Sequence, residues 1–160
     1  MRIDAVHHAR EPGGLHATLW FMLSLLEDYG TDPLATYLVN ERELYFVPIV
    51  NPDGYVYHQT TSPGGGGMWR KNRRHNGGGV FGVDLNRNYP EKWGWDNTGS
   101  SGSPSSGTYR GPAPGSEPEV QAMLDFMAAR AFRTAITAHT YSNYWMHPWG
   151  YAVLEPPNVA

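Results

Sequence analysis

The feature that most restricts the fold is an alternation of short apolar segments with segments of helical periodicity. Residues 2–6 predict a strand, and Pro12 suits the first turn of a helix, where its missing N–H costs nothing. Leucines and methionines then recur at helical spacing, which predicts a helix over residues 12–29. Residues 43–50 are nearly all apolar and predict a strand buried on both faces.

The alternation continues through the rest of the chain. Residues 34–39 predict a short helix, and residues 116–119 have the pattern of a capping box that opens a helix ending near residue 130. Residues 132–138 predict another buried strand, and residues 144–151 a further strand. Strands that alternate with helices predict an α/β fold: a three-layer sandwich with a mixed, mainly parallel sheet and helices on both faces.

Composition fits one globular domain and argues against several other classes. The chain has 160 residues, of which 40% are hydrophobic, and this length can bury a core. Its net charge of −3 is too small to favour nucleic acid or a membrane surface as the partner, and no apolar run approaches the roughly 20 residues that span a bilayer. The lack of cysteine excludes disulfides and thiolate metal sites. Glycine and proline cluster in residues 62–67 and 77–79 and in residues 99–115, which predict long surface loops.

Polar side chains follow three of the predicted strands at their carboxyl ends. These residues are His8, Asn51 and His139, and ligands of α/β sheets gather at that edge. Asn51 also opens a turn by composition, Asn-Pro-Asp-Gly. His8 and Glu11 form a His-x-x-Glu pair, and imidazole nitrogen and carboxylate oxygen are both zinc ligands. His139 would be the third ligand, because catalytic zinc typically takes three protein ligands and a water.

A structural role for these histidines is an alternative. A His-x-x-Glu pair occurs by chance in many chains, and a lone histidine at a strand end is more often structural. His7 competes with His8, although it has no acidic partner at the same spacing, because the residue three positions later is Arg10. The residues taken alone leave both interpretations open.

Two polar segments between the loops suggest substrate contacts. Residues 68–74 are basic and would pass as a solvated surface patch, but an arginine there that faced a metal would stabilise the oxyanion of a hydrated peptide carbonyl. Asn86 and Arg87 would pass as part of a polar loop. An Asn-Arg pair can also bind a free carboxylate, because the arginine fork supplies two parallel hydrogen bonds.

A set of motifs, in order along the chain, resembles the zinc carboxypeptidases of the carboxypeptidase A/B/T type. The motifs are HAREP, NPDGY, MWRKNR, GVDLNRNY, SEPE before a helix, TAHTYS and PWGY. Any one motif is weak, but the ordered set is highly specific. The resemblance implies a carboxypeptidase-like fold and the following site residues: His8, Glu11 and His139 as ligands of one Zn²⁺ per chain, Arg70 as the oxyanion-stabilising arginine, Asn86 and Arg87 at the terminal carboxylate of the substrate, and Arg10 with Tyr141 along the path to the preceding substrate residue.

The resemblance implies a zinc-dependent hydrolase that removes C-terminal residues from peptides and proteins, in an extracellular or periplasmic setting. The family's general-base glutamate and capping tyrosine have no motif match here, so residues 1–160 are expected to form a partial catalytic domain that lacks both ends. If the 160-residue chain were active without that glutamate, Glu117, Glu119 and Glu155 would be the candidates for the general base. One alternative is a catalytically silent module that binds zinc or peptide, and a weaker one is a zinc amide deacylase. Exposed sheet edges would also favour self-association.

Overall fold

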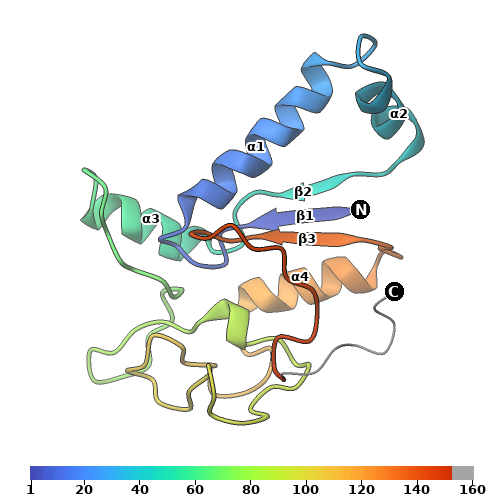
Figure 1. The fold of residues 1–160 in the computed structure, drawn as a ribbon. Helices are drawn as coiled ribbons and strands as arrows, with labels where there is room; N and C mark the ends of the chain where they lie inside the picture. The colour runs from blue at the N-terminus through green and yellow to red at the C-terminus, as the bar shows by residue number, and fades with distance from the viewer. Residues whose placement is uncertain (153–160) are drawn as a thin grey trace.

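The computed structural model describes residues 1–152, and three strands form its sheet in the order β2–β1–β3 (Figure 1). The central strand is β1 (Arg2–Ala5), with β2 (Tyr45–Val47) and β3 (Ala135–Ala138) at the two edges. Both pairings are parallel, with Arg2 opposite Tyr45 on one side and Ala135 on the other. The mainly parallel sheet expected from the sequence is therefore present, and the carboxyl ends of all three strands meet at one edge.

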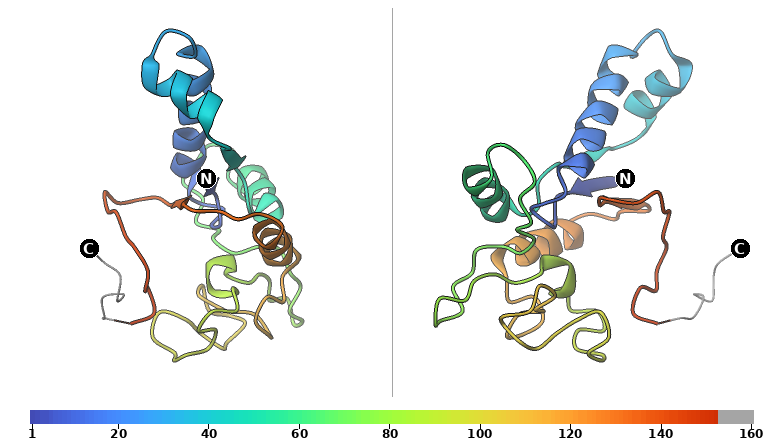
Figure 2. Two further views of the ribbon diagram at one scale, coloured as in Figure 1. Left: turned by 90° about the vertical axis from the view of Figure 1, so that its right-hand side faces the viewer. Right: turned by 60° about the vertical axis from the view of Figure 1, so that its left-hand side comes forward.

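Helices cover both faces of the sheet, as predicted. On one side lie α1 (Pro12–Glu27) and α2 (Pro33–Glu41), and on the other lies α4 (Pro118–Ala128) (Figures 1 and 2). Each face has its own buried apolar cluster. One cluster contains Ala5, Val6 and Leu15, and the other contains Val50, Leu85, Val120 and Met123. The three-layer α/β arrangement is confirmed, and the predicted helices over 12–29 and 34–39 correspond to α1 and α2.

The segment that was predicted only as a turn begins a helix, α3 (Pro52–Thr61). Asn51 is its N-cap residue, and its side-chain oxygen accepts a hydrogen bond of 3.0 Å from the Gly54 amide. Pro52 suits the first helical position, so the turn-like composition in fact marks a helix start. Gly54 is required by close packing, because a Cβ there would lie 2.5 Å from both Asn51 Oδ1 and the Lys71 carbonyl oxygen.

Two strand predictions differ from the structure in length and burial. The segment 132–138 forms only the four residues of β3, which are mostly exposed: Ile136 keeps 39% of its surface. The segment 43–50 contributes only the three half-buried residues of β2. Residues 144–151 form turns and irregular backbone instead of the predicted strand.

The start of α4 also differs from the predicted capping box. Its N-cap residue is Glu117, whose side chain makes no capping hydrogen bond. Ser116, expected as the cap, instead donates its hydroxyl to Glu117 Oε1 at 2.7 Å. The helix nevertheless ends at Ala128, close to the predicted boundary.

The long chain between α3 and α4 lies below the sheet (Figure 1). Its one named element within the described residues is the short 3₁₀ turn η1 (Leu85–Arg87), which begins where Asp84 Oδ1 accepts a hydrogen bond from the Asn86 amide at 3.1 Å. The predicted glycine-rich loops are confirmed here. No helix in residues 1–152 is both long enough and apolar enough to cross a bilayer.

Candidate metal centre

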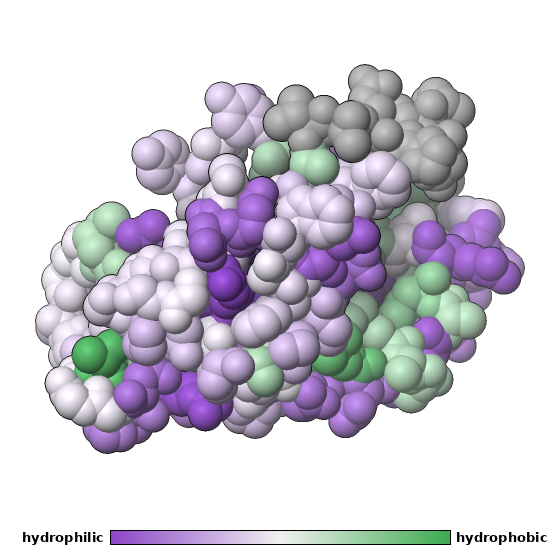
Figure 3. All heavy atoms as spheres, turned by 90° about the horizontal axis from the view of Figure 1, so that it is seen from below, coloured by the Kyte–Doolittle hydropathy of each residue, from purple (hydrophilic) through white to green (hydrophobic). Residues whose placement is uncertain are grey.

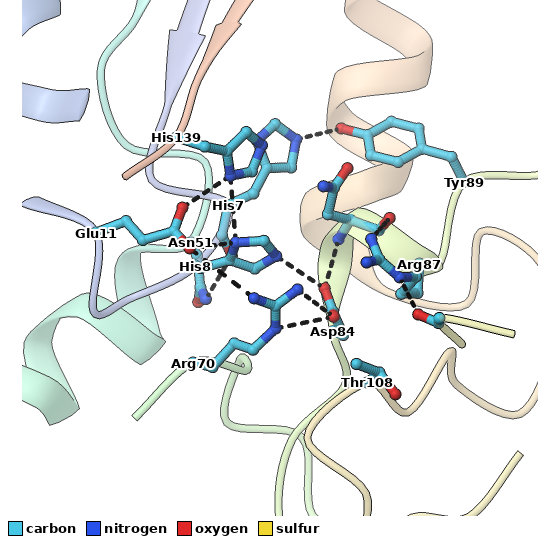
Figure 4. A network of polar contacts seen from close by, with 12 residues as sticks. His7, His8, Glu11, Asn51, Arg70, Asp84, Arg87, Tyr89, Thr108 and His139 are labelled. Atoms are coloured by element: carbon cyan, nitrogen blue, oxygen red, sulfur yellow. Dashed lines mark hydrogen bonds and ion pairs between the residues drawn. The ribbon is translucent and has the colours of Figure 1, made fainter. Parts of the chain in front are cut away.

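The side chains of His8, Glu11 and His139 converge at the carboxyl edge of the sheet (Figure 4). Their ligand atoms all lie within 4.8 Å of one another. Glu11 bridges the two histidines, with Oε1 at 2.9 Å from His8 Nδ1 and Oε2 at 2.8 Å from His139 Nδ1. The two Nδ1 atoms are 3.2 Å apart. Two imidazole nitrogens and a carboxylate directed at one point are the donor set that catalytic zinc takes, so these residues fit the metal.

The local backbone explains why residues so distant in sequence meet. His8 follows β1, Glu11 is the N-cap residue of α1, and His139 follows β3 directly. The first turn of α1 packs against the end of β3 so closely that a Cβ on Gly14 would lie 2.9 Å from the Ala138 carbonyl oxygen. This approach brings His139 beside Glu11.

Asp84 supports the cluster from the opposite side, and sequence reasoning did not single it out. Its carboxylate is fully buried, and Oδ1 lies 3.1 Å from His8 Nε2, the ring nitrogen that faces away from Glu11. A carboxylate on the second nitrogen fixes the ring orientation and tautomer of a ligating histidine. The available signal was its place in Asp-Leu-Asn-Arg, two residues before the proposed carboxylate-binding pair.

The charges of the cluster stabilise one another. Burial opposes ionisation of Glu11, but hydrogen bonds from His139 and His8 outweigh burial and hold its pKa well below the usual range. Burial also opposes protonation of His8, yet its hydrogen bonds to Asp84 and Glu11 raise its pKa. For Asp84, burial is likewise outweighed by the hydrogen bond to His8, and the pKa is lowered. The two ionised carboxylates, Glu11 and Asp84, thus stabilise a positive charge on the groups that lie between them.

Arg70 lies against this cluster. Its Nε and Nη2 atoms donate to Asp84 Oδ2 at 3.0 and 2.8 Å, and its Nη1 atom is 3.9 Å from Glu11 Oε1. The double contact with Asp84 fixes the plane of the guanidinium. A positive group is therefore held at the edge of the candidate metal centre.

The other predicted substrate residues are arranged around two cavities. One cavity, of about 960 Å³, is lined by Arg10, Arg70 and Arg87 among others. Arg87 donates from Nε to the Gly99 carbonyl at 2.7 Å and from Nη1 to the Asn86 carbonyl at 3.0 Å. Asn86 is exposed and lines a second cavity, of about 880 Å³. His139 and Tyr141 line this second cavity too.

Tyr141 is the predicted residue that the structure does not bring to Arg70. Its side chain is 95% exposed. It lines the cavity on the β3 side, whereas Arg10 lines the cavity on the Arg70 side. The two residues expected along one substrate path thus border different cavities in this structure.

His7, the competitor of His8, has a structural environment. Its Nε2 atom is 2.9 Å from the Tyr89 hydroxyl, and its ring stacks on His139 with the centroids 5.8 Å apart. Asn51 donates from Nδ2 to the His7 carbonyl at 3.1 Å. Burial, together with the nearby His139, lowers the pKa of His7 to about 3, so its imidazole is neutral. It packs behind the cluster and is not among the three converging ligands.

A parallel α/β sheet with a His/Glu/His group at the carboxyl ends of its strands is typical of a metal-dependent hydrolase. The family model described as zinc carboxypeptidase matches residues 1–160. The chain belongs to the zinc carboxypeptidase family.

Individual relatives agree with this membership. Carboxypeptidase A2 of Rattus norvegicus is 42% identical over 156 residues, which cover 96% of this chain and 36% of the relative. Carboxypeptidase A1 of Rattus norvegicus is 36% identical over 160 residues, which cover 99% of this chain and 37% of the relative. The chain therefore spans little more than a third of the length of these curated relatives.

Solved structures give the same result for the fold. A crystal structure of thrombin activatable fibrinolysis inhibitor superposes with a TM-score of 0.88 at 36% identity, over 98% of this chain and 39% of that one. The bovine form of that protein, in complex with tick carboxypeptidase inhibitor, gives a TM-score of 0.85 at 35% identity, over 98% of this chain and 51% of that one. The fold is therefore carboxypeptidase-like.

Proposed function

We propose that this chain belongs to a zinc carboxypeptidase that hydrolyses the last peptide bond of peptides and proteins, and that residues 1–160 form part of its catalytic domain. The observation that carries the proposal is the convergence of His8, Glu11 and His139 within 4.8 Å, beside an arginine that is held in place. An extracellular or periplasmic setting is part of the proposal and rests on the family resemblance.

His8, Glu11 and His139 would hold one Zn²⁺. Bound zinc polarises a carbonyl and lowers the pKa of a water in its fourth position. Asp84 would keep His8 in the tautomer that presents Nδ1 to the metal, because Asp84 occupies Nε2 at 3.1 Å.

Arg70 would stabilise the negative charge that develops on the scissile carbonyl oxygen. Its guanidinium is fixed by two hydrogen bonds to Asp84, so it needs no reorganisation during the reaction. Its Nη1 atom lies 3.9 Å from Glu11, a ligand candidate, so its positive charge would lie next to the reacting centre.

Asn86 and Arg87 would bind the free carboxylate of the substrate. Within the described part of the chain, Arg87 hydrogen-bonds to two carbonyl oxygens, those of Gly99 and Asn86. A carboxylate is a stronger partner for a guanidinium than a carbonyl, so a substrate terminus can replace these contacts. Selection of a free C-terminus separates a carboxypeptidase from an endopeptidase and from an amide deacylase. Arg10 and Tyr141 would contact residues further along the peptide.

A second candidate is a module that binds zinc and peptide without turning substrate over. Both carboxylates at the cluster already have partners, since Glu11 bridges the histidines and Asp84 holds His8 and Arg70. Glu117 is bound instead to Asn72 at 2.8 Å. Glu119, another possible base, also contacts Asn72, and Glu155 lies outside the described residues.

The test assays the full-length protein with two substrates, with and without a chelator. One is a blocked dipeptide with a free C-terminal carboxylate, and the other is the same dipeptide with an amidated C-terminus. We expect hydrolysis of the free acid only, lost on chelation and restored by zinc. Arg87→Ala should raise KM by about tenfold or more, because it removes the hydrogen bonds to the terminal carboxylate of the substrate. Arg70→Ala should lower kcat by about 10²–10³-fold, because it removes oxyanion stabilisation.

The same assay on the 160-residue chain separates the two candidates. Binding that discriminates the free acid from the amide, without turnover, would establish the silent module. Equal binding of the acid and the amide, or turnover that survives chelation, would contradict the carboxypeptidase proposal.

A further inference from the structure

The 960 Å³ cavity beside the candidate metal centre is lined by an unusual concentration of positive charge. Five basic side chains line it: Arg10, Arg70, Lys71, Arg73 and Arg87. The described residues that line it include no aspartate and no glutamate. The loop face of the molecule is mainly hydrophilic, and strongly hydrophilic atoms lie in a recess between the loops (Figure 3).

Most of this charge is not neutralised. Among the described residues, Arg70 alone of these five pairs with carboxylates, Asp84 at 2.8 Å and Glu11 at 3.9 Å. Within residues 1–152, the other four basic side chains form no ion pair with an acidic side chain. Arg87 contacts carbonyl oxygens, and Lys71, which is buried, donates its ammonium to the Pro104 carbonyl at 2.9 Å. Buried or partly buried charges without counter-ions make such a cavity attractive to anions.

Arg73 supplies a charge that is fixed in position. Its guanidinium carbon lies 3.6 Å from the ring centroid of Tyr57, 4.6 Å from that of Trp69 and 4.5 Å from that of Phe81. Three aromatic faces stabilise the cation and hold it in the cavity wall without cancelling its charge. The positive potential is therefore a built feature of the wall.

We infer that this cavity selects substrates with an acidic side chain upstream of the bond that is cut. The inference rests on the proposed function, in which Arg87 binds the terminal carboxylate and Arg70 faces the scissile carbonyl. In that proposal Arg10 contacts residues further along the peptide, and Arg10 lines the same cavity as Arg70 and is half-buried. An upstream glutamate or aspartate side chain then enters the field of Arg10, Lys71 and Arg73.

The test compares two peptides, Ac-Ala-Glu-Ala-Phe and Ac-Ala-Gln-Ala-Phe, both with a free C-terminus. Their dissociation constants are measured on the zinc-loaded chain at low and at high salt. We expect the glutamate peptide to bind about fivefold more tightly at low salt, the effect of one partly screened charge contact. The ratio should fall towards one at high salt.

Charge-removing variants locate the effect. Arg10→Gln and Lys71→Gln should each lower the ratio to about twofold, whereas Arg133→Gln should leave it unchanged. Arg133 is a matched control, because it is exposed and does not line the cavity. Circular dichroism checks that each variant is folded. If Lys71→Gln does not fold, the comparison of Arg10→Gln with the wild type is sufficient for the test.

A ratio of one in the wild type, or a ratio that neither cavity variant changes, would overturn the inference. Failure of the proposed function gives a different result. In that case the amidated forms of both peptides bind as tightly as the free acids, whatever the ratio between glutamate and glutamine.

Discussion

Glu11 contacts two histidines that lie on opposite sides of it in sequence, one three residues away and the other near the end of the described chain. If these three residues form the metal centre, each of them is necessary and the neighbouring His7 is not. His139→Ala should weaken zinc binding by more than about 100-fold, because it removes a direct ligand. His7→Ala should leave binding nearly intact. Isothermal titration calorimetry of the two variants measures both values, and similar losses in both would show that the ligand assignment is wrong.

Asp84 gives a second prediction at the same scale. Asp84→Asn keeps the size of the side chain but removes the charge that holds His8 Nε2 and Arg70. We expect zinc affinity to fall by about 10–100-fold, since an orienting partner and not a ligand is lost. Competition with a zinc-binding dye measures the change. An unchanged affinity would mean that His8 is oriented without Asp84. Asp96→Asn serves as a control, because Asp96 is exposed and its carboxylate accepts from the Thr98 amide at 2.8 Å instead of holding His8.

The residues that could be predicted are those whose chemistry shows in a short motif. His8 and Glu11 stand three residues apart, and a strand-end position marked His139. The role of Asp84 could not be predicted in this way, because it depends on a loop folding back under β1, a contact between residues 76 positions apart. The separation of Tyr141 from Arg10 also depends on where an irregular segment runs, which no motif specifies.

At the scale of elements, the least expected feature is α3, whose start was taken for a turn. The Asn51 side chain makes two contacts there. Its oxygen accepts from the Gly54 amide and caps the helix, and its Nδ2 atom donates to the His7 carbonyl next to the cluster. Turn and N-cap positions favour the same residue types, so composition did not distinguish them. Three of the four predicted strands were placed correctly but were too long in the prediction, because apolar character continues beyond the paired residues, and the fourth, over residues 144–151, does not form.

The dual role of Asn51 makes it sensitive to substitution. Asn51→Ala should lower the free energy of unfolding by about 2–4 kcal/mol, since a helix cap is lost and a buried carbonyl is left without its donor. Urea unfolding followed by circular dichroism measures the change. The exposed Asn40, which accepts only from the Tyr29 hydroxyl at 3.1 Å, is the matched control. Asn40→Ala should cost less than about 0.5 kcal/mol. Equal effects would contradict the role given to Asn51.

At the scale of the whole molecule, many large apolar side chains are exposed among the described residues. On α1, Trp20 is 71% exposed and Leu26 is 63% exposed, and the edge strand β3 is largely uncovered. Exposed apolar faces and unpaired strand edges both favour association. We predict that the 160-residue chain self-associates at micromolar concentration. Size-exclusion chromatography with light scattering tests this, and Trp20→Glu with Leu26→Glu should shift the chain towards the monomer. A monomer in the unmodified chain would contradict the prediction.

The central claim is that this sheet edge holds a zinc ion through His8, Glu11 and His139. X-ray absorption spectroscopy of the zinc-loaded chain tests it most directly. The account predicts about one tightly bound zinc with imidazole and carboxylate donors at about 2.0–2.2 Å, and the loss of one imidazole in His139→Ala. A spectrum without imidazole scattering, or one that His139→Ala leaves unchanged, would contradict it.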